Sequence, residues 1–332
     1  MPAEWEPHDA TILAWPHEKD DWPEKHECIP WVYLEILRHL TQSEKVYLLI
    51  GKSMEKQIHS LFDKQRLDPR QIQLLRVPTD RCWMRDSAPI FVHNEFGERI
   101  AIDWKFNAWA KYDNWKKDNC VPQRLTDLIE IPRLVAEHDG RQVVLEGGSI
   151  DVDGKGSMLT TEECLLSPIQ ARNPSMSRED LEGVFSRYLG IEHVIWLGRG
   201  IEGDDTHGHV DDITRFVDVG QVVTVVEQNR DDPNYEPLQE NLRRLRREKL
   251  DVIELPMPEP VFFNGQRLPA SYANFYIANE HVLVPTFNDS ADRLALGILA
   301  DLFPTRKVVG IHAVDLVWGL GTLHCMTQQV PV

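Results

Sequence analysis

The chain has 332 residues, of which 42% are hydrophobic and 27% are charged, and this composition is typical of a soluble globular protein. Its formal net charge of −17 would repel phosphate backbones, which argues against nucleic acid as a partner. No apolar run approaches the roughly 18 residues that span a bilayer, and the N-terminal segment lacks signal-peptide features, so we expect a cytoplasmic protein that binds no membrane.

Strands are predicted where short runs rich in Val, Ile, Thr and aromatic residues are bounded by Gly, Pro, Asn or Asp. In chain order they are Thr11–Trp15, Lys45–Ile50, Ile72–Val77, Ile90–His93, Arg99–Phe106, Gln142–Leu145, Ser157–Thr160, His193–Leu197, Ile213–Val217, Val222–Glu227, Val252–Leu255, Asn274–Ala278, His281–Pro285 and Lys307–Ile311. Between them, apolar positions at a 3.6-residue spacing predict helices over Trp31–Leu40, Ser53–Gln65, Val121–Ile129, Ser177–Leu189, Tyr235–Lys249 and Ser290–Phe303. Ser177 is the expected N-cap of one helix, and Asp289 or Ser290 that of another.

A unit of two paired strands, a helix and a further strand recurs in the C-terminal half of the chain. One copy runs from Asp212 to Leu255 and the next from Asn274 to Ile311. Their period is about 60 residues, so about five such units would fit in the chain. This pattern fits ββαβ units repeated around a centre, and it fits an ordinary mixed α/β sheet with coincidental spacing about equally well.

Cys325 follows two glycines in the C-terminal segment Gly319-Leu-Gly-Thr-Leu-His-Cys. Glycine allows a tight backbone turn, so the thiol could be displayed as a nucleophile with polar groups nearby to stabilise the thiolate. The alternative is an inert buried cysteine. The other four cysteines form no CxxC pair and predict no disulfide framework; they are Cys28, Cys82, Cys120 and Cys164.

The segment 203–212 is rich in histidine and aspartate. His207, His209 and Asp211 alternate, so on an extended strand they would share one face. In one interpretation His209 transfers protons and Asp211 holds a cationic substrate. In the other the three side chains bind a metal, as in dinuclear metallo-β-lactamase-type sites, although Asp212 stands where that pattern has His and no helical His pair supplies further ligands.

Two more carboxylates, Asp86 and Glu146, end apolar runs elsewhere in the chain. A guanidinium is planar and permanently charged, and carboxylates bind it bidentately, so two of them could hold its central carbon in place. A thiolate could then attack that carbon, while a histidine oriented by a third carboxylate protonates the departing ammonia and activates water. This chemistry needs no cofactor.

These blocks, in this order, resemble the agmatine deiminases and the Porphyromonas-type peptidyl-arginine deiminases of the guanidine-modifying superfamily. The matching segments are MPAEWEPHDATILAWP, WMRDSAP, EGGSID, GDDTHGHVDD, NFYIANEHVLVPTFND and GTLHCMTQQVP. The resemblance implies an α/β fold, a five-fold pseudosymmetric propeller of ββαβ units known as the pentein fold. It also implies a single deiminase domain over residues 1–332.

The resemblance implies roles for six residues. Cys325 would be the nucleophile that forms an amidino-cysteine intermediate, His209 the general acid and base, and Glu146 its orienting partner. Asp86 and Asp211 would clamp the guanidinium, and Trp83 would form a wall of the pocket. Arg85 is expected to brace Asp86. No metal is implied, and assembly into a homo-oligomer is compatible with the sequence.

Four positions near the expected pocket depart from the family pattern: Ala88, His207, Asn288 and Thr322. None removes a catalytic group, so they bear on the substrate more than on the reaction.

Agmatine, a small guanidinium cation that would yield N-carbamoylputrescine and ammonia, is the expected substrate. Peptidyl-arginine and free arginine are the alternatives. The peptidyl enzymes of this type are exported, and no carboxylate-binding arginine could be assigned for free arginine. A metal-dependent hydrolase using His207, His209 and Asp211 is less favoured, as is a non-catalytic binding protein of the same fold.

Overall fold

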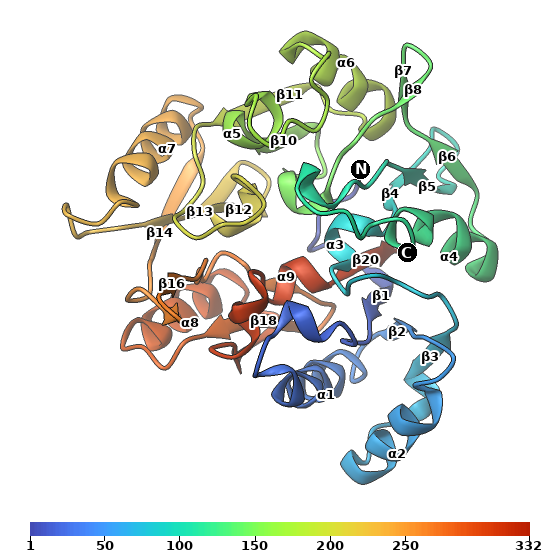
Figure 1. The fold of residues 1–332 in the computed structure, drawn as a ribbon. Coiled ribbons are helices and arrows are strands. Elements are labelled where there is room, and N and C mark those ends of the chain that lie inside the picture. The colour runs from blue at the N-terminus through green and yellow to red at the C-terminus, as the bar shows by residue number, and fades with distance from the viewer.

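The computed structural model describes residues 1–332, which fold as five small α/β units around a common centre (Figure 1). In each unit two strands pair antiparallel, and the strand that follows the helix pairs parallel with the second of them. The helix between the second and third strands of each unit lies on the outside of the ring (Figure 1). This arrangement confirms the ββαβ repetition predicted from the sequence.

Four of the units are continuous in sequence. Their first strands begin at residues 90, 151, 214 and 276, which gives the expected period. The first of these units consists of β4 (Ile90–His93), β5 (Arg99–Asp103), α4 (Val121–Ile129) and β6 (Arg133–Val135), and the second of β9 (Asp151–Val152), β10 (Ser157–Thr161), α5 (Glu162–Leu166), α6 (Arg178–Leu189) and β11 (His193–Leu197). The third consists of β12 (Thr214–Asp218), β13 (Gln221–Val226), α7 (Tyr235–Arg247) and β14 (Asp251–Pro256). The fourth consists of β17 (Tyr276–Ile277), β18 (His281–Thr286), α8 (Ala291–Leu302) and β19 (Lys307–His312).

The fifth unit joins the two ends of the chain and closes the ring. The C-terminal strand pairs antiparallel with the first strand, with Thr11 opposite Gln329. Its elements are β20 (Gln328–Pro331), β1 (His8–Ala14), α1 (Ile29–Leu40), β2 (Lys45–Leu49), α2 (Glu55–Gln65) and β3 (Ile72–Leu75). This closure brings residues near both termini to the centre of the molecule.

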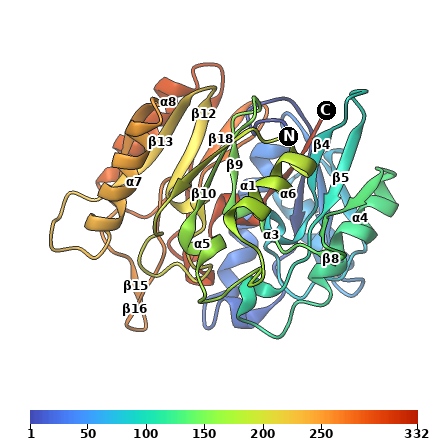
Figure 2. The same cartoon turned by 90° about the horizontal axis from the view of Figure 1, so that it is seen from above.

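Two short hairpins lie outside the repeat. They are β7–β8 (Glu137–His138 with Arg141–Gln142) and β15–β16 (Phe262–Phe263 with Gln266–Arg267). Figure 2 shows β15–β16 projecting beyond the body of the ring. Phe263 of this hairpin packs against Trp318, with ring centroids 4.5 Å apart. None of the helices combines the length and apolarity that a membrane-spanning segment needs.

Several predicted strands are shorter than the apolar pattern suggested, among them Ile72–Val77, which ends at Leu75. The strand expected over Arg99–Phe106 ends at Asp103. Most of Gln142–Leu145 is not a regular strand, because the Asn173 side chain bonds both the N–H and the C=O of Val144. The strand expected over Asn274–Ala278 is reduced to Tyr276–Ile277.

Helix caps agree with the sequence in one case and differ in another. Ser177 forms a capping box with Asp180 at the start of α6, a feature worth about 1 kcal/mol. At α8 the Ser290 side chain makes no capping bond, whereas the Asp289 carboxylate accepts the N–H of Ala291.

Candidate active site

Five segments, each directly before the first strand of a unit, meet at the centre of the ring. They are α3 (Met84–Ser87), the 3-10 turn Gly147–Ser149, the 3-10 turn Val210–Asp212, residues 271–275, and α9 (Leu323–Met326). Because the units repeat around the centre, equivalent positions face one another although they are far apart in sequence. Figure 1 shows α3 and α9 at this centre.

The six predicted site residues lie on or beside these segments, and each is at most 6% exposed; they are Trp83, Asp86, Glu146, His209, Asp211 and Cys325. Their convergence can be measured from Gly148. A Cβ atom on Gly148 would lie 2.6 Å from His209 Nδ1, 2.9 Å from Asp86 Oδ1 and 3.0 Å from Asp211 Oδ2. Three reactive groups therefore surround one point, which only a residue without a side chain leaves open.

Asp86 is held by two donors. Trp109 Nε1 donates to Oδ2 at 2.9 Å, and the N–H of Gly148 donates to Oδ1 at 3.1 Å. Burial raises the pKa of Asp86 to about 6, with Asp211 and Glu146 adding to the effect and His209 opposing it. The carboxylate is thus fixed in direction but poorly compensated in charge, and a cation would stabilise it.

His209 lies between two carboxylates. Its Nδ1 is 3.8 Å from Asp86 Oδ1, and its Nε2 is 3.8 Å from Glu146 Oε2. Burial alone would lower the pKa of His209, but Asp86, Cys164 and Glu146 outweigh burial and raise it well above its ordinary value. These neighbours favour the protonated imidazole, which can act as an acid.

Arg172, which was not predicted from the sequence, forms a buried ion pair with Glu146. Its Nε donates to Glu146 Oε1 at 3.0 Å, and its other nitrogens donate to the carbonyls of Gln170 and Thr206. Burial opposes ionisation, but Arg172 and His209 together lower the pKa of Glu146 to about 2. Glu146 is consequently a permanent anion beside the histidine.

Cys325 lies on α9 with its sulfur near two polar groups. Asn274 Nδ2 donates to Sγ at 3.0 Å, and Asp211 Oδ2 is 3.7 Å from Sγ. Burial raises the pKa of the thiol well above its ordinary value, and Asp211, Asp212 and Asp86 raise it further. Cys325 is a neutral thiol in the free protein.

Asp211 has one occupied and one free oxygen. Oδ2 lies 2.7 Å from His324 Nδ1, whereas Oδ1 has no hydrogen-bond partner. Glu146 Oε2 and both ring nitrogens of His209 also lack hydrogen-bond partners. Because buried polar groups in proteins are almost always satisfied, this concentration of free donors and acceptors is suited to a polar ligand.

A pocket of about 210 Å³ leads from Cys325 to the surface. Its lining combines aromatic and acidic side chains. The aromatic residues are Trp83, Trp109, Tyr112 and Trp318, and the acidic residues beyond Asp86 are Asp20, Asp21 and Asp205. Gln266 of the β15–β16 hairpin also belongs to the lining. Aromatic faces together with carboxylates suit a cationic molecule.

Two expectations from the sequence were wrong. His207, His209 and Asp211 do not share a strand face, because the chain turns through a left-handed residue at His207 (φ 66°) and the His207 ring bonds Ser167 Oγ instead. The metal-ligand set proposed from these three residues is therefore not assembled. Arg85 does not brace Asp86, since its guanidinium bonds Glu4, Gln329 and the carbonyl of His324.

Different combinations of buried side chains come close enough together to hold a metal ion. They form two groups of three, which include four of the predicted site residues: Glu146, Cys164 and His209; and Asp211, Asp212 and Cys325. Glu146 already pairs with Arg172.

The profile of the Porphyromonas-type peptidyl-arginine deiminase family matches residues 1–331. The chain belongs to this family. It is 35% identical over 360 residues to the agmatine deiminase of Ectopseudomonas mendocina (strain ymp), an alignment that covers 100% of this chain and 95% of the relative. The protein is accordingly a guanidino-group deiminase, a hydrolase acting on amidines, and the non-catalytic interpretation is wrong.

Solved structures of this family superpose closely. The agmatine deiminase of Enterococcus faecalis has a TM-score of 0.88 at 33% identity, covering 100% of this chain and 95% of that one. A C. jejuni agmatine deiminase with substrate bound has a TM-score of 0.89 at 30% identity, covering 99% and 95%. Two amidine-modifying proteins at 13% and 12% identity, with TM-scores of 0.52 and 0.58, share the fold alone.

One of the four departures from the family pattern takes part in the site. Thr322 Oγ1 donates to Asn274 Oδ1 at 2.7 Å, and the same oxygen accepts the N–H of His324 at 3.0 Å. Thr322 therefore helps to orient the amide that bonds the thiol. Asn288 adopts a left-handed conformation (φ 59°), and Ala88 ends α3.

Proposed function

We propose that this deiminase converts agmatine to N-carbamoylputrescine and ammonia through a covalent amidino-Cys325 intermediate. The observation that carries the proposal is the arrangement of Cys325 and Asp86, which line the pocket, with His209 3.8 Å from Asp86 and Asp211 3.7 Å from the thiol behind them. Asp86 and Asp211 would bind the guanidinium, and Trp83 would form one wall. No metal or cofactor is used in this scheme.

Substrate binding would activate the nucleophile. The carboxylates that suppress ionisation of Cys325 are the ones that would receive the guanidinium, including the free Oδ1 of Asp211. Once the cation neutralises them, the thiol can lose its proton to solvent through the pocket that Cys325 lines, and the Asn274 amide donates to the thiolate. The enzyme would therefore form its nucleophile only when a cationic substrate is present.

The reaction then proceeds in two halves. The thiolate adds to the guanidinium carbon, and the C=N electron pair moves to nitrogen. The His209 imidazolium protonates a terminal nitrogen, the C–N bond breaks and ammonia leaves. Neutral His209 next takes a proton from water, whose oxygen adds to the amidino carbon. The C–S bond breaks, Cys325 is restored, and the product carries a ureido group.

The lining of the pocket favours a substrate with a second positive charge. Beyond Asp86 it contains three carboxylates, Asp20, Asp21 and Asp205, of which Asp21 pairs with Arg81 and Asp205 pairs with Lys111. Arg81 is the one basic residue in the lining. Arg81 is already paired with Asp21 and lies over the Tyr112 ring at 4.4 Å, so its charge is largely compensated. A distal ammonium, as in agmatine, is better matched to this surface than the carboxylate of free arginine.

The test is a comparison of ammonia release from agmatine, free arginine and an arginine peptide blocked at both ends, using the purified full chain. We expect agmatine to have the highest kcat/KM by at least about tenfold, since one compensated charge contact is worth about 1.5–3 kcal/mol. Ammonia from the blocked peptide without ammonia from agmatine would assign the enzyme to peptidyl-arginine instead.

A further inference from the structure

We propose that Glu4 and His324 are positioning residues that set the direction of the Asp211 carboxylate beside Cys325. This inference rests on the proposed function, because it assumes that Asp211 binds substrate. Asp211 lies next to the nucleophile, with Oδ2 3.7 Å from Cys325 Sγ, whereas neither Glu4 nor His324 lines the pocket. Both would act through Asp211 rather than by touching the substrate.

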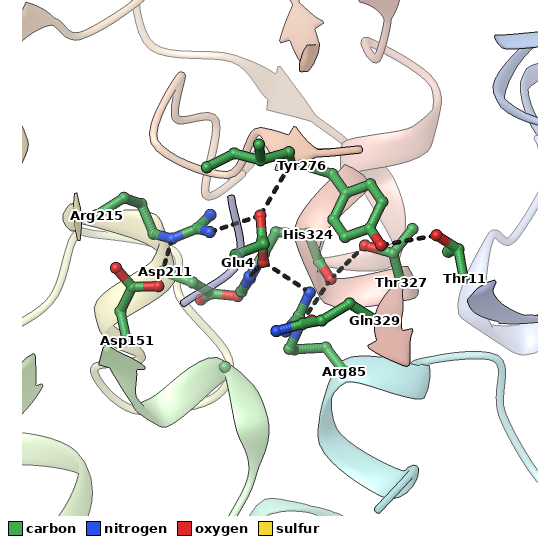
Figure 3. A network of polar contacts seen from close by, with 12 residues as sticks. Glu4, Thr11, Arg85, Asp151, Asp211, Arg215, Tyr276, His324, Thr327 and Gln329 are labelled. Carbon is green, nitrogen blue, oxygen red and sulfur yellow. Dashed lines mark hydrogen bonds and ion pairs between the residues drawn. The ribbon is translucent and has the colours of Figure 1, made fainter. Parts of the chain in front are cut away.

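A continuous chain of short contacts links the three residues, as Figure 3 shows. Asp211 Oδ2 lies 2.7 Å from His324 Nδ1, and His324 Nε2 lies 2.8 Å from Glu4 Oε2. All three side chains are at most 5% exposed. The imidazole is therefore fixed at both ends and cannot rotate without breaking a buried bond.

The partners of Glu4 fix its protonation state. Its carboxylate faces Arg85 at 3.0 Å and His324 at 2.8 Å on Oε2, and Arg215 and the N–H of Ile277, both at 2.9 Å, on Oε1. The arginines and the amide can only donate, so Glu4 is an ionised acceptor. Burial opposes ionisation, but Arg215, His324 and Arg85 keep the pKa of Glu4 well below its ordinary value.

Both ring nitrogens of His324 face a carboxylate. Nε2 faces the ionised Glu4, and Nδ1 faces Asp211, whose pKa is lowered by His324 in spite of its burial. The cluster joins three basic side chains (Arg85, Arg215 and His324) to three carboxylates (Glu4, Asp151 and Asp211), and each of these carboxylates has at least one basic partner.

The consequence concerns the two oxygens of Asp211. Because His324 engages Oδ2, the carboxylate plane is set and Oδ1 is left without a partner. Without His324 the carboxylate could rotate, and its charge near Asp86 and Asp212 would favour protonation. Either change would weaken the guanidinium contact and raise KM. Glu4 comes from the N-terminal segment, so that segment helps to complete the site.

The experiment is a double-mutant cycle between His324 and Asp211, with agmatine as the probe. His324→Leu removes both ring nitrogens, whereas His324→Asn keeps an amide N–H at the position of Nδ1. We expect His324→Leu to raise KM about 10- to 100-fold, the range for loss of a hydrogen bond to a charged group, and His324→Asn to recover most of that loss. In an Asp211→Asn background, His324→Leu should raise KM by less than about a further threefold, because the two residues act as one unit.

Glu4→Gln tests the same chain of contacts from Glu4 through His324 to Asp211 without changing His324. If His324→Leu does not fold, this variant alone tests the positioning role. It should raise KM in the wild-type background and have little effect beside Asp211→Asn. His281→Gln is the matched control, since this buried histidine lies on β18 outside the site. It should leave KM unchanged.

Two outcomes would overturn the proposal. One is a His324→Leu or Glu4→Gln effect of equal size in both backgrounds, which would indicate a structural role. The other is a fall in kcat at constant KM, with no recovery by His324→Asn. If Asp211→Asn itself leaves KM unchanged, Asp211 does not bind the guanidinium and the proposed function fails at this residue. That result differs from one in which Asp211→Asn raises KM but the Glu4 and His324 variants do not.

Discussion

Arg172 Nε lies 3.0 Å from Glu146 Oε1, and neither side chain reaches solvent. A buried charge that loses its partner costs about 3–5 kcal/mol, because the low-dielectric surroundings cannot solvate it. Arg172→Met should therefore lower the free energy of unfolding by about that amount at pH 7, as urea denaturation would measure.

The pH dependence of this effect follows from Glu146. Its pKa is about 2 in the folded protein, below its ordinary value, so its ionised form stabilises the fold above that ordinary value. The stabilisation is lost as the pH falls toward 2. The loss of unfolding free energy caused by Arg172→Met should accordingly become smaller as the pH falls toward 2. The double variant Arg172→Met/Glu146→Gln should recover part of the loss at pH 7, and equal deficits in the single and double variants would contradict this account.

Gly148→Ala should nearly abolish activity. The new methyl group would lie within 3.0 Å of His209 Nδ1, Asp86 Oδ1 and Asp211 Oδ2, so all three groups must move. A displacement of about 1 Å at a catalytic centre costs on the order of 100-fold in rate, and steady-state ammonia release would measure it. Gly183→Ala is the control, since a Cβ there meets nothing within 4 Å, and it should leave kcat/KM unchanged. Full activity in Gly148→Ala would show that the site lies elsewhere.

The acidic limb of the pH profile of kcat/KM should reflect ionisation of the Asp86 carboxyl group. Its pKa is about 6 in the free protein, and only the ionised carboxylate attracts a guanidinium, so kcat/KM should fall as the pH drops through 6. A bound cation favours the ionised form, so the acid limb of kcat should lie at lower pH than that of kcat/KM. A pH–rate series with agmatine would measure both limbs. Coincident limbs, or a flat profile down to pH 5, would argue against Asp86 as a clamp.

Asn274 is the neutral donor to the nucleophile, and Asn274→Ala should slow the reaction without weakening substrate binding greatly. Loss of the 3.0 Å bond to Sγ removes one stabilising contact from the thiolate, so kcat should fall about 10- to 100-fold. The rate of Cys325 alkylation by iodoacetamide against pH would check the cause. Its midpoint should move to higher pH in the variant, and an unchanged midpoint would assign Asn274 a purely structural role.

The fold could be predicted from sequence largely because it repeats. Local apolar patterns marked all six major helices, and the period near 60 residues indicated several similar units. The pattern failed where a side chain replaces the regular backbone ladder, as Asn173 does at Val144. It also failed at Asn274, whose amide bonds three residues of the segment 322–325 and holds its own segment out of the strand.

The candidate site was predictable only in part. The six predicted residues stand in short motifs, and the resemblance of these motifs to a known family implied their roles. Arg172, Asn274, His324 and Glu4 act through partners that are distant in sequence, so no local spacing marks them. His207 illustrates the opposite error, because a regular alternation was interpreted as a strand where the chain turns.

The covalent intermediate on Cys325 is the central claim, and intact-protein mass spectrometry tests it most directly. The protein would be mixed with agmatine and quenched in acid within the first turnovers, alongside Cys325→Ser and Cys28→Ser, the latter removing an exposed thiol. We expect a transient amidino adduct in the wild type and in Cys28→Ser, and none in Cys325→Ser. Ammonia release that persists in Cys325→Ser, or an adduct that remains in that variant, would contradict the mechanism.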